Sequence, residues 1–333
     1  MKKIITLAIT TIMVAAWSAS AFAADIIVYS ARKEHLIKPL FEAYTAETGV
    51  KIKYITGKAG ALLERIKAEG ANTSADLFIT VDAGNLWYAA EEGVLAPIKS
   101  ATLEKNVPSH LRDPQNRWFG LSVRARTIVY NKNKVSPEEL STYEALGDSK
   151  WNKRLLLRTS KKVYNQSLVA SFIADNGEVE TEKVIKSWIA NLPVAPFSSD
   201  TKALEAVAAG VGDVAIVNTY YFGRLLKKNP ELPLAIFWPN QKTNGVHMNA
   251  SGAGVTANAK NKKEAIKLLE WLSSDKAQGK FAALNLEYPV NPEVKPDPIV
   301  AAWGEFKGNP MNVSNYGKFQ AEAIKLMDRA GYK

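Results

Sequence analysis

Short apolar runs alternate with segments of helical periodicity along the first third of the chain. The runs predict strands at residues 26–29, 50–55 and 75–80, and the segments between them predict helices at residues 36–47, 61–68 and 84–92. Strands that alternate with helices in this way are typical of an α/β sheet with crossover helices. The first third of the chain therefore predicts three β-α units in one lobe.

Residues 118–130 form one long alternating stretch, which suits a strand that passes between two lobes. A second series follows, with strands at 154–157, 214–217 and 234–237 and helices at 166–175, 179–189, 201–209 and 222–227. After a strand at 251–256 the pattern changes to helices, at 263–273, 275–284 and 319–330. The two series predict two similar lobes.

The fold class that we predict is α/β: two α/β lobes joined by hinge strands, as in the bilobal periplasmic solute-binding proteins, which close around a ligand between the lobes. Residues 24–122 and about 246–285 are expected to form the N-terminal lobe. Residues from about 123–245, together with 286–333, are expected to form the C-terminal lobe. The fold alone specifies no ligand.

The first residues predict an export signal. Lys2 and Lys3 precede an apolar run over residues 4–17, and Ala21-Phe22-Ala23 is an A-x-A cleavage site. The run is too short to span a bilayer, which needs about 20 apolar residues. We therefore expect residues 1–23 to be a cleaved signal peptide and the mature chain to be exported and soluble.

Charge and cysteine content narrow the function classes. The formal charge of +10 falls to +8 when Lys2 and Lys3 leave with the signal peptide. The basic residues are scattered rather than gathered in a stripe with interleaved aromatics, so we expect no nucleic-acid partner, although anionic ligands would be attracted. The chain has no cysteine, so it must be held together by burial without disulfides.

No enzyme motif stands out. The chain contains no G-x-S-x-G, P-loop, G-x-G-x-x-G or H-E-x-x-H motif, and its histidines, at positions 35, 110 and 247, lie far apart in the sequence. We expect no enzymatic activity. A periplasmic hydrolase built from residues distant in the sequence stays a less favoured alternative.

Tyrosines are the candidate chemical groups. Tyr220 and Tyr221 follow the strand at 214–217, and Tyr164 lies at the equivalent place after the strand at 154–157. Ligands of open α/β sheets bind at the carboxyl ends of strands. One interpretation is that these phenols only pack at helix starts. The other is a metal site, because oxygen anions suit a hard trivalent cation.

Two segments that contain these tyrosines, residues 158–168 and 218–223, resemble the periplasmic ferric-ion-binding proteins of bacterial iron ABC transporters. The resemblance extends over essentially the whole mature chain and is greatest to the branch that includes cyanobacterial iron-uptake proteins. Further segments that carry it are residues 28–32, 68–76, 119–126, 247–252, 287–290 and 326–331. The resemblance implies periplasmic localisation, a monomer, and an inner-membrane ABC permease as the partner that receives Fe³⁺.

The resemblance also implies a set of ligands. It assigns the metal-binding tyrosines to Tyr164, Tyr220 and Tyr221. Some relatives add a His, or a His and a Tyr, at positions occupied here by Lys33 and Glu34. The chain departs from the relatives' pattern here, and Glu34 and His35 are possible additional ligands for an octahedral position that the tyrosines and an anion leave open.

Other relatives complete the site with a synergistic carbonate or bicarbonate held by arginines that match Arg32 and Arg124. Two alternatives for these arginines remain open. One is that they form salt bridges, and the other is that they bind an oxyanion or organic anion in a protein that carries it without metal.

Overall fold

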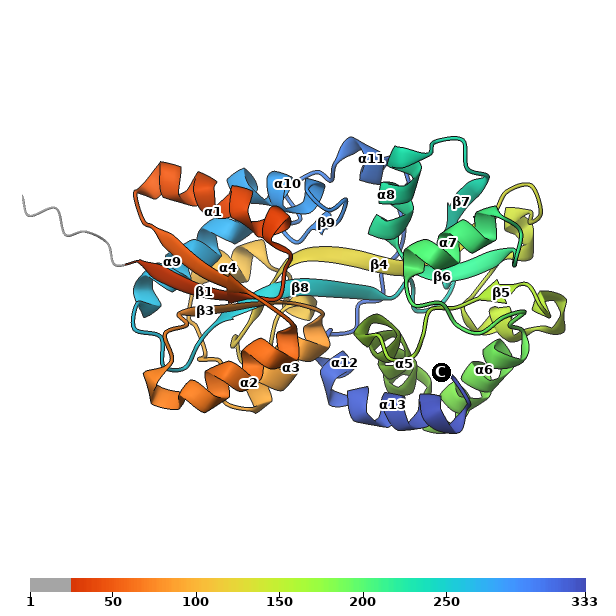
Figure 1. Ribbon diagram of the computed structural model, residues 1–333, viewed down its shortest axis with the longest axis horizontal. Coiled ribbons are helices and arrows are strands. Elements are labelled where there is room, and N and C mark those ends of the chain that lie inside the picture. Colours follow the sequence, from red (N-terminus) through yellow and green to blue (C-terminus); the bar gives the residue numbers. More distant parts are fainter. Residues whose placement is uncertain (1–24) are drawn as a thin grey trace, which may run out of the picture.

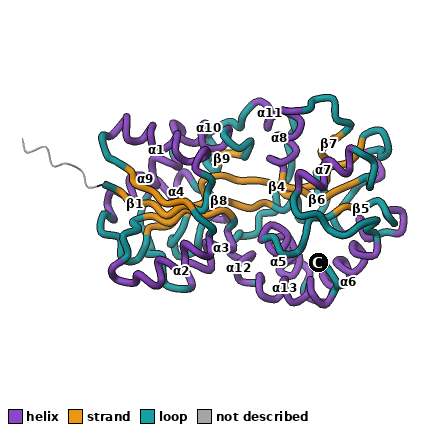
Figure 2. Tube along the Cα trace, in the orientation of Figure 1, coloured by secondary structure: helices purple, strands orange, loops and turns teal. Residues whose placement is uncertain are grey.

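The computed structural model describes residues 25–333, so the predicted signal peptide lies outside the described residues. Two lobes lie side by side along the long axis of the molecule (Figure 1). Strands run through the middle of both lobes and helices cover them (Figure 2). This arrangement confirms the predicted two-lobe α/β fold. Within residues 25–333, no helix is both long enough and apolar enough to cross a membrane.

The first lobe has a mixed sheet, in which β1 pairs in parallel with both β2 and β3 and the other pairs are antiparallel. Two helices from late in the chain, α9 and α10, complete the lobe, and their Leu268 and Phe281 lie in the same apolar core as Val28 of β1. The elements of this lobe are β1 (Ile26–Ser30), α1 (Glu34–Thr48), β2 (Ile52–Thr56), α2 (Ala59–Glu69), β3 (Leu77–Val81), α3 (Ala83–Glu91), α4 (Ala101–Asn106), α9 (Lys262–Ser273) and α10 (Asp275–Ala283).

The second lobe is built around β6, which pairs in parallel with the short β5. A separate apolar core fills it, to which Leu168 of α5, Ile185 of α6 and Leu326 of α13 contribute. The elements of this lobe are β5 (Leu155–Leu156), α5 (Val163–Asn176), α6 (Glu178–Ala190), α7 (Asp200–Ala208), β6 (Val214–Asn218), α8 (Thr219–Lys228), β7 (Leu234–Phe237), α11 (Pro298–Ala301) and α13 (Gln320–Arg329).

Two long strands, β4 (Phe119–Asn131) and β8 (Met248–Val255), connect the lobes (Figure 1). The first half of β4 pairs with β8 and with the short β9 (Tyr288–Pro289), and its second half pairs with β6 and β7. The predicted strand that passes between lobes is therefore confirmed. Its register sets Arg124 opposite Asn249 of β8 and Arg126 opposite Asn218 of β6.

The division of the chain into lobes remains our proposal, with one modification near the C-terminus. The segment 286–333 was expected to belong to the second lobe. However, Val290, Val313 and Tyr316 pack in the first lobe's core, whereas α13 packs in the second. Helix α12 (Ser314–Lys318) contacts both α3 and α5, so it bridges the lobes.

Several predicted element bounds were wrong. The helix predicted from 222 begins at Thr219, and the helix predicted from 166 begins at Val163, whereas the helix predicted at 319–330 is confirmed as α13, with the short α12 before it. Asn218 is extended and leads directly into α8, and neither Gly nor Pro interrupts the Thr-Tyr-Tyr that follows. The tyrosines of both segments thus lie in first helical turns, not in the turns before them.

Candidate metal centre

A cavity of about 250 Å³ is lined by predicted site residues from both lobes. Tyr164, Tyr220 and Tyr221 line it from the second lobe, and Arg32 and Arg124 line it from the first lobe and the connecting strand β4. The other lining residues are Ala31, Lys33, Leu36, Val81, Lys162, Arg224, Ser251, Asn285 and Glu287. The structure therefore brings the three tyrosines and both arginines together.

Tyr164 is the second residue of α5 and is nearly buried. The guanidinium carbon of Arg124 lies 5.5 Å from the centre of its ring, that of Arg158 lies 5.6 Å away, and Nζ of Lys162 lies 5.0 Å away. Cations at this distance from an aromatic face are attracted to it. The phenol therefore lies among positive charges, which also favour an oxygen anion.

Tyr220 and Tyr221 open α8, and their ring centres are 4.4 Å apart. The Tyr220 hydroxyl accepts a hydrogen bond of 3.2 Å from Nδ2 of Asn218, and the Tyr221 hydroxyl accepts one of 3.4 Å from Nη1 of Arg158. One turn later in α8, the guanidinium carbon of Arg224 lies 5.1 Å from the ring centre of Tyr220 and 4.8 Å from that of Tyr221. Each of these adjacent phenols thus has its own hydrogen-bond donor.

Burial controls the protonation of two of these phenols. It raises the pKa of Tyr164, and the neighbouring Tyr221 raises it further against the effect of Arg124. Burial also raises the pKa of Tyr220 well above its ordinary value, together with Tyr164 and Tyr221. At neutral pH the empty cavity therefore holds Tyr164 and Tyr220 as neutral phenols, which a bound metal ion would have to deprotonate.

Arg32 forms an ion pair inside the cavity. Its Nη2 lies 2.7 Å from Oε2 of Glu287, which also accepts a hydrogen bond of 2.9 Å from Ser122 Oγ. Burial alone would raise the pKa of the Glu287 carboxyl, but Arg32 and Arg124 outweigh it and hold the pKa below its ordinary value. Glu287 is therefore ionised at neutral pH and already occupies one side of the Arg32 guanidinium.

Arg124 has a carboxylate partner as well. Its Nη2 lies 3.3 Å from Oδ2 of Asp82, and its Nη1 donates a hydrogen bond of 3.3 Å to Ser251 Oγ. Asp82 caps α3 by accepting a hydrogen bond from the backbone N–H of Gly84 at 3.0 Å. Any anion bound by both arginines would share them with Asp82 and Glu287.

A family model for bacterial extracellular solute-binding proteins matches residues 31–279. The chain belongs to this family. Iron uptake protein A1 of Synechocystis sp. is 46% identical to this solute-binding protein over 93% of the chain and 88% of the relative's length.

Two solved structures are also similar to this solute-binding protein. A Trichodesmium protein (IdiA, FutA) in complex with iron and citrate is 47% identical, with a TM-score of 0.90 over 93% of this chain and 100% of that chain. A ferric binding protein from Campylobacter jejuni is 34% identical, with a TM-score of 0.86 over 93% of this chain and 100% of that one.

Glu34 and His35 of the solute-binding protein do not line the cavity. Both are exposed at the start of α1, and Glu34 accepts a hydrogen bond of 3.0 Å from the Tyr54 hydroxyl. The structure thus places these two possible ligands apart from the tyrosines. Lys33, the residue before them, does reach the cavity.

Sequence reasoning missed several charged residues of the cavity. Glu287 lies in a segment that carried the family resemblance but received no role, and Lys162 and Arg224 were not singled out. A signal was available for these two cations, because each lies within four residues of a predicted tyrosine ligand. The contact between Glu287 and Arg32 joins residues 255 positions apart, so no local pattern could reveal it.

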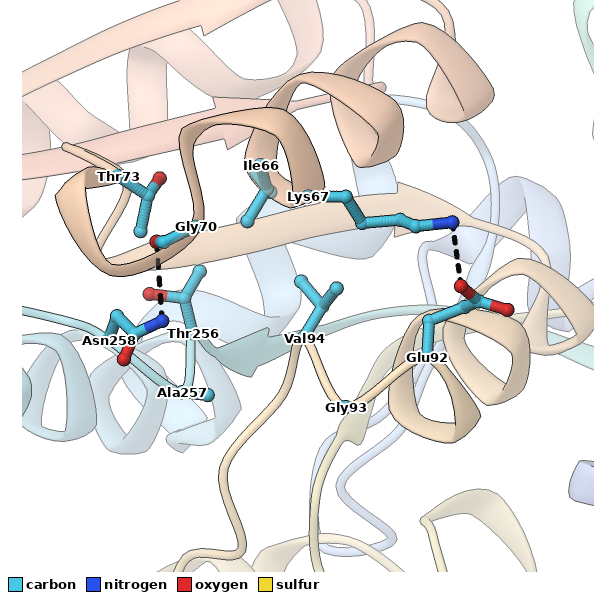
Figure 3. A pocket seen from close by; sticks show the side chains of 10 residues that line it. All are labelled: Ile66, Lys67, Gly70, Thr73, Glu92, Gly93, Val94, Thr256, Ala257 and Asn258. Atoms are coloured by element: carbon cyan, nitrogen blue, oxygen red, sulfur yellow. Dashed lines mark hydrogen bonds and ion pairs between the residues drawn. The ribbon is translucent and has the colours of Figure 1, made fainter.

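A second cavity of the solute-binding protein, of about 300 Å³, lies within the first lobe (Figure 3). Lys67 and Glu92, which both line it, form an ion pair of 2.6 Å. Asn258 donates a hydrogen bond of 3.2 Å to the carbonyl of Gly70. Because its charged side chains are paired and it contains no tyrosine, this cavity lacks the chemistry of the one between the lobes.

Proposed function

We propose that this protein is the extracytoplasmic binding component of an iron ABC importer, and that it captures Fe³⁺ between its lobes through Tyr164, Tyr220 and Tyr221. The observation that carries this proposal is that three phenols from two helix starts line one cavity among cations. The iron named for the Synechocystis, Trichodesmium and Campylobacter relatives supports the choice of metal. Iron is here a cargo, not a resident cofactor.

The donor set suits this cargo. Phenolates are hard anionic oxygens, which prefer hard cations, and three of them neutralise the charge of Fe³⁺. A metal ion that replaces three protons is bound tightly at neutral pH and less tightly in acid. The site therefore suits a carrier that must hold the ion and later release it.

A bound anion is part of the proposal. Five cationic side chains (Arg32, Lys33, Arg124, Lys162 and Arg224) and one carboxylate (Glu287) line the cavity, which leaves a formal charge of +4. Because three phenolates cancel the charge of Fe³⁺, this +4 persists in the loaded cavity and favours an anion beside the metal. We propose carbonate or bicarbonate in this role, with Arg32 and Arg124 among its partners, and citrate, as in the Trichodesmium structure, as the competing choice.

The remaining parts of the proposal concern the cellular setting. We propose that the predicted signal peptide directs the protein to the periplasm, where it acts as a monomer and delivers iron to an inner-membrane ABC permease. Membership of the extracellular solute-binding family and the iron-uptake name of the Synechocystis relative support this setting. Its role is binding and delivery, without catalysis or nucleic acid.

One observation favours a second candidate, a metal-free carrier of organic anions. Arg32 and Arg124 form ion pairs within residues 25–333, whereas Lys33, Lys162 and Arg224 form none in that part of the chain. Their charge would attract an anion even without iron. This candidate predicts tight anion binding by protein from which iron has been removed.

Titration with Fe³⁺ distinguishes the two candidates. We expect a visible phenolate-to-iron absorption band, which weakens together with iron affinity in Tyr164→Phe, Tyr220→Phe and Tyr221→Phe. Tyr88→Phe is the matched control, because Tyr88 is exposed on α3 away from the cavity. A protein that stays colourless, and that binds citrate equally well with and without iron, would support the metal-free carrier instead.

A further inference from the structure

Arg158 lies behind the cavity, between two of the proposed ligands. Its guanidinium carbon is 5.6 Å from the ring centre of Tyr164 and 5.8 Å from that of Tyr221, and its Nη1 donates the hydrogen bond of 3.4 Å to the Tyr221 hydroxyl. Its backbone carbonyl accepts hydrogen bonds of 2.7 Å from Asn165 and 2.6 Å from the Tyr332 hydroxyl. Arg158 is only 7% exposed, and these hydrogen bonds hold both its side chain and its backbone in place.

A continuous chain of buried polar contacts connects the two adjacent phenols. Nη1 of Arg158 lies 3.5 Å from Oδ2 of Asp200, and the same oxygen lies 3.2 Å from Nη1 of Arg126. Arg126 Nη1 also donates a hydrogen bond of 3.0 Å to Oδ1 of Asn218, whose Nδ2 donates to the Tyr220 hydroxyl. Arg126 and Asn218 face each other because the register of β4 and β6 makes them partners.

The buried charges in this series of polar contacts do not cancel one another. Arg126 and Arg158 are both buried and share the single carboxylate of Asp200. Two guanidinium groups and one carboxylate leave one positive charge in a place where desolvation makes it unfavourable. The Tyr221 oxygen is within hydrogen-bond distance of this charge, and as a metal-bound phenolate it would accept a stronger hydrogen bond from it than a neutral phenol does.

We propose that Arg158 is a positioning residue for the iron site, and that Asp200 and Arg126 hold it so that it donates a charged hydrogen bond to the Tyr221 oxygen. This inference rests on the proposed function, because it requires Tyr221 to bind iron. The two adjacent phenols then differ: Tyr220 accepts from a neutral amide and Tyr221 from a cation. A charged donor forms a stronger and more directional bond than a neutral one.

Iron binding by Arg158→Gln, Arg158→Lys and Asp200→Asn tests the inference. A cationic donor lowers the energy of the phenolate electrons, so its removal should shift the iron charge-transfer band of Arg158→Gln to longer wavelength. Iron affinity should fall about ten- to one hundredfold, as is usual when a group that holds a metal ligand is removed. Arg158→Lys keeps the charge and should show a smaller shift, and Asp200→Asn, which removes the carboxylate that holds Arg158, should also lower iron affinity.

Arg117→Gln is the matched control, because Arg117 forms ion pairs of 2.8 Å with Asp113 and with Glu91 in the first lobe. It should lose stability without any shift of the band. If Arg158→Gln does not fold, the smaller shift of Arg158→Lys decides. This inference alone is overturned if the wild-type protein gains the band and every Arg158 and Asp200 variant has the same band wavelength and the same iron affinity as the wild type. A wild-type protein that gains no band overturns the proposed function and this inference with it.

Discussion

The Ser167 hydroxyl donates a hydrogen bond of 2.8 Å to Oδ1 of Asp82, and the two residues belong to different lobes. Ser167 lies one turn after Tyr164 on α5, and Asp82 caps α3. Asp82 also accepts from Asn249 of β8 at 3.0 Å and pairs with Arg124 of β4. A single carboxylate thus joins both lobes to both connecting strands, directly behind the cavity.

Removing this contact should weaken iron binding without unfolding the protein. Ser167→Ala deletes one donor of Asp82 and leaves three, so we expect a loss of about 0.5–1.5 kcal/mol in unfolding free energy. Iron affinity should fall several-fold, because α5 loses its hydrogen bond to Asp82 of the first lobe. Urea unfolding and competition with a chelator measure the two effects. Ser187→Ala is the control, since that hydroxyl donates to a carbonyl of its own helix in the second lobe, and an equal loss of affinity there would contradict the interpretation.

Iron should be released by acid. Burial raises the pKa of Tyr164 and Tyr220, so protons compete for these oxygens throughout the neutral range. Binding through three phenols displaces about three protons, and affinity should therefore fall by up to about three decades for each pH unit below neutrality. Chelator competition from pH 8 to pH 5 measures this slope. A nearly flat curve would point to carboxylate ligands, which titrate only near about pH 4.

Iron loading should depend on an added anion. The cavity keeps its excess of positive charge after three phenolates and Fe³⁺ cancel, so loading in bicarbonate-free buffer should be weak and should recover with bicarbonate. Arg124→Lys should blunt the recovery, because lysine cannot present the paired donors of a guanidinium. Citrate tests the competing anion, and chloride is the control. Equal loading in all these buffers would rule out a synergistic anion.

Glu287 should limit how strongly the cavity holds its anion. Glu287→Gln removes the carboxylate 2.7 Å from Arg32 and frees that guanidinium for the bound anion. We expect half-maximal loading at a lower bicarbonate concentration, together with a loss of about 3–5 kcal/mol in unfolding free energy, because a buried ion pair loses one partner. Glu293→Gln, at a nearby exposed position, should change neither quantity. Unchanged bicarbonate dependence in Glu287→Gln would show that Arg32 does not bind the anion.

The sequence predicted those features that depend on local pattern. The alternation over 118–130 predicted β4 as the strand shared by the lobes, and two short motifs predicted the tyrosines that the cavity brings together. The exact start of α8 was missed because the side chain of Asn218 forms hydrogen bonds with Arg126 and Tyr220 and does not cap the helix. The surroundings of the arginines could not be predicted either. They depend on strand register and on contacts between residues far apart in the sequence, such as the cluster that Arg124 forms with Asp82 and Asn249.

The position of β8 in the sheet has a consequence for how the chain folds. β8 lies between β3 and β4, and the helices after it complete the first lobe's core, although all the strands of the second lobe precede it in the sequence. The first lobe is thus begun early but needs residues up to at least 283, and the core of the second lobe is completed still later, by α13. A chain truncated after residue 245 should show no protease-resistant first lobe. The predicted export signal would therefore act on a chain that cannot fold prematurely, and the cleft would form only after nearly the entire protein has crossed the membrane.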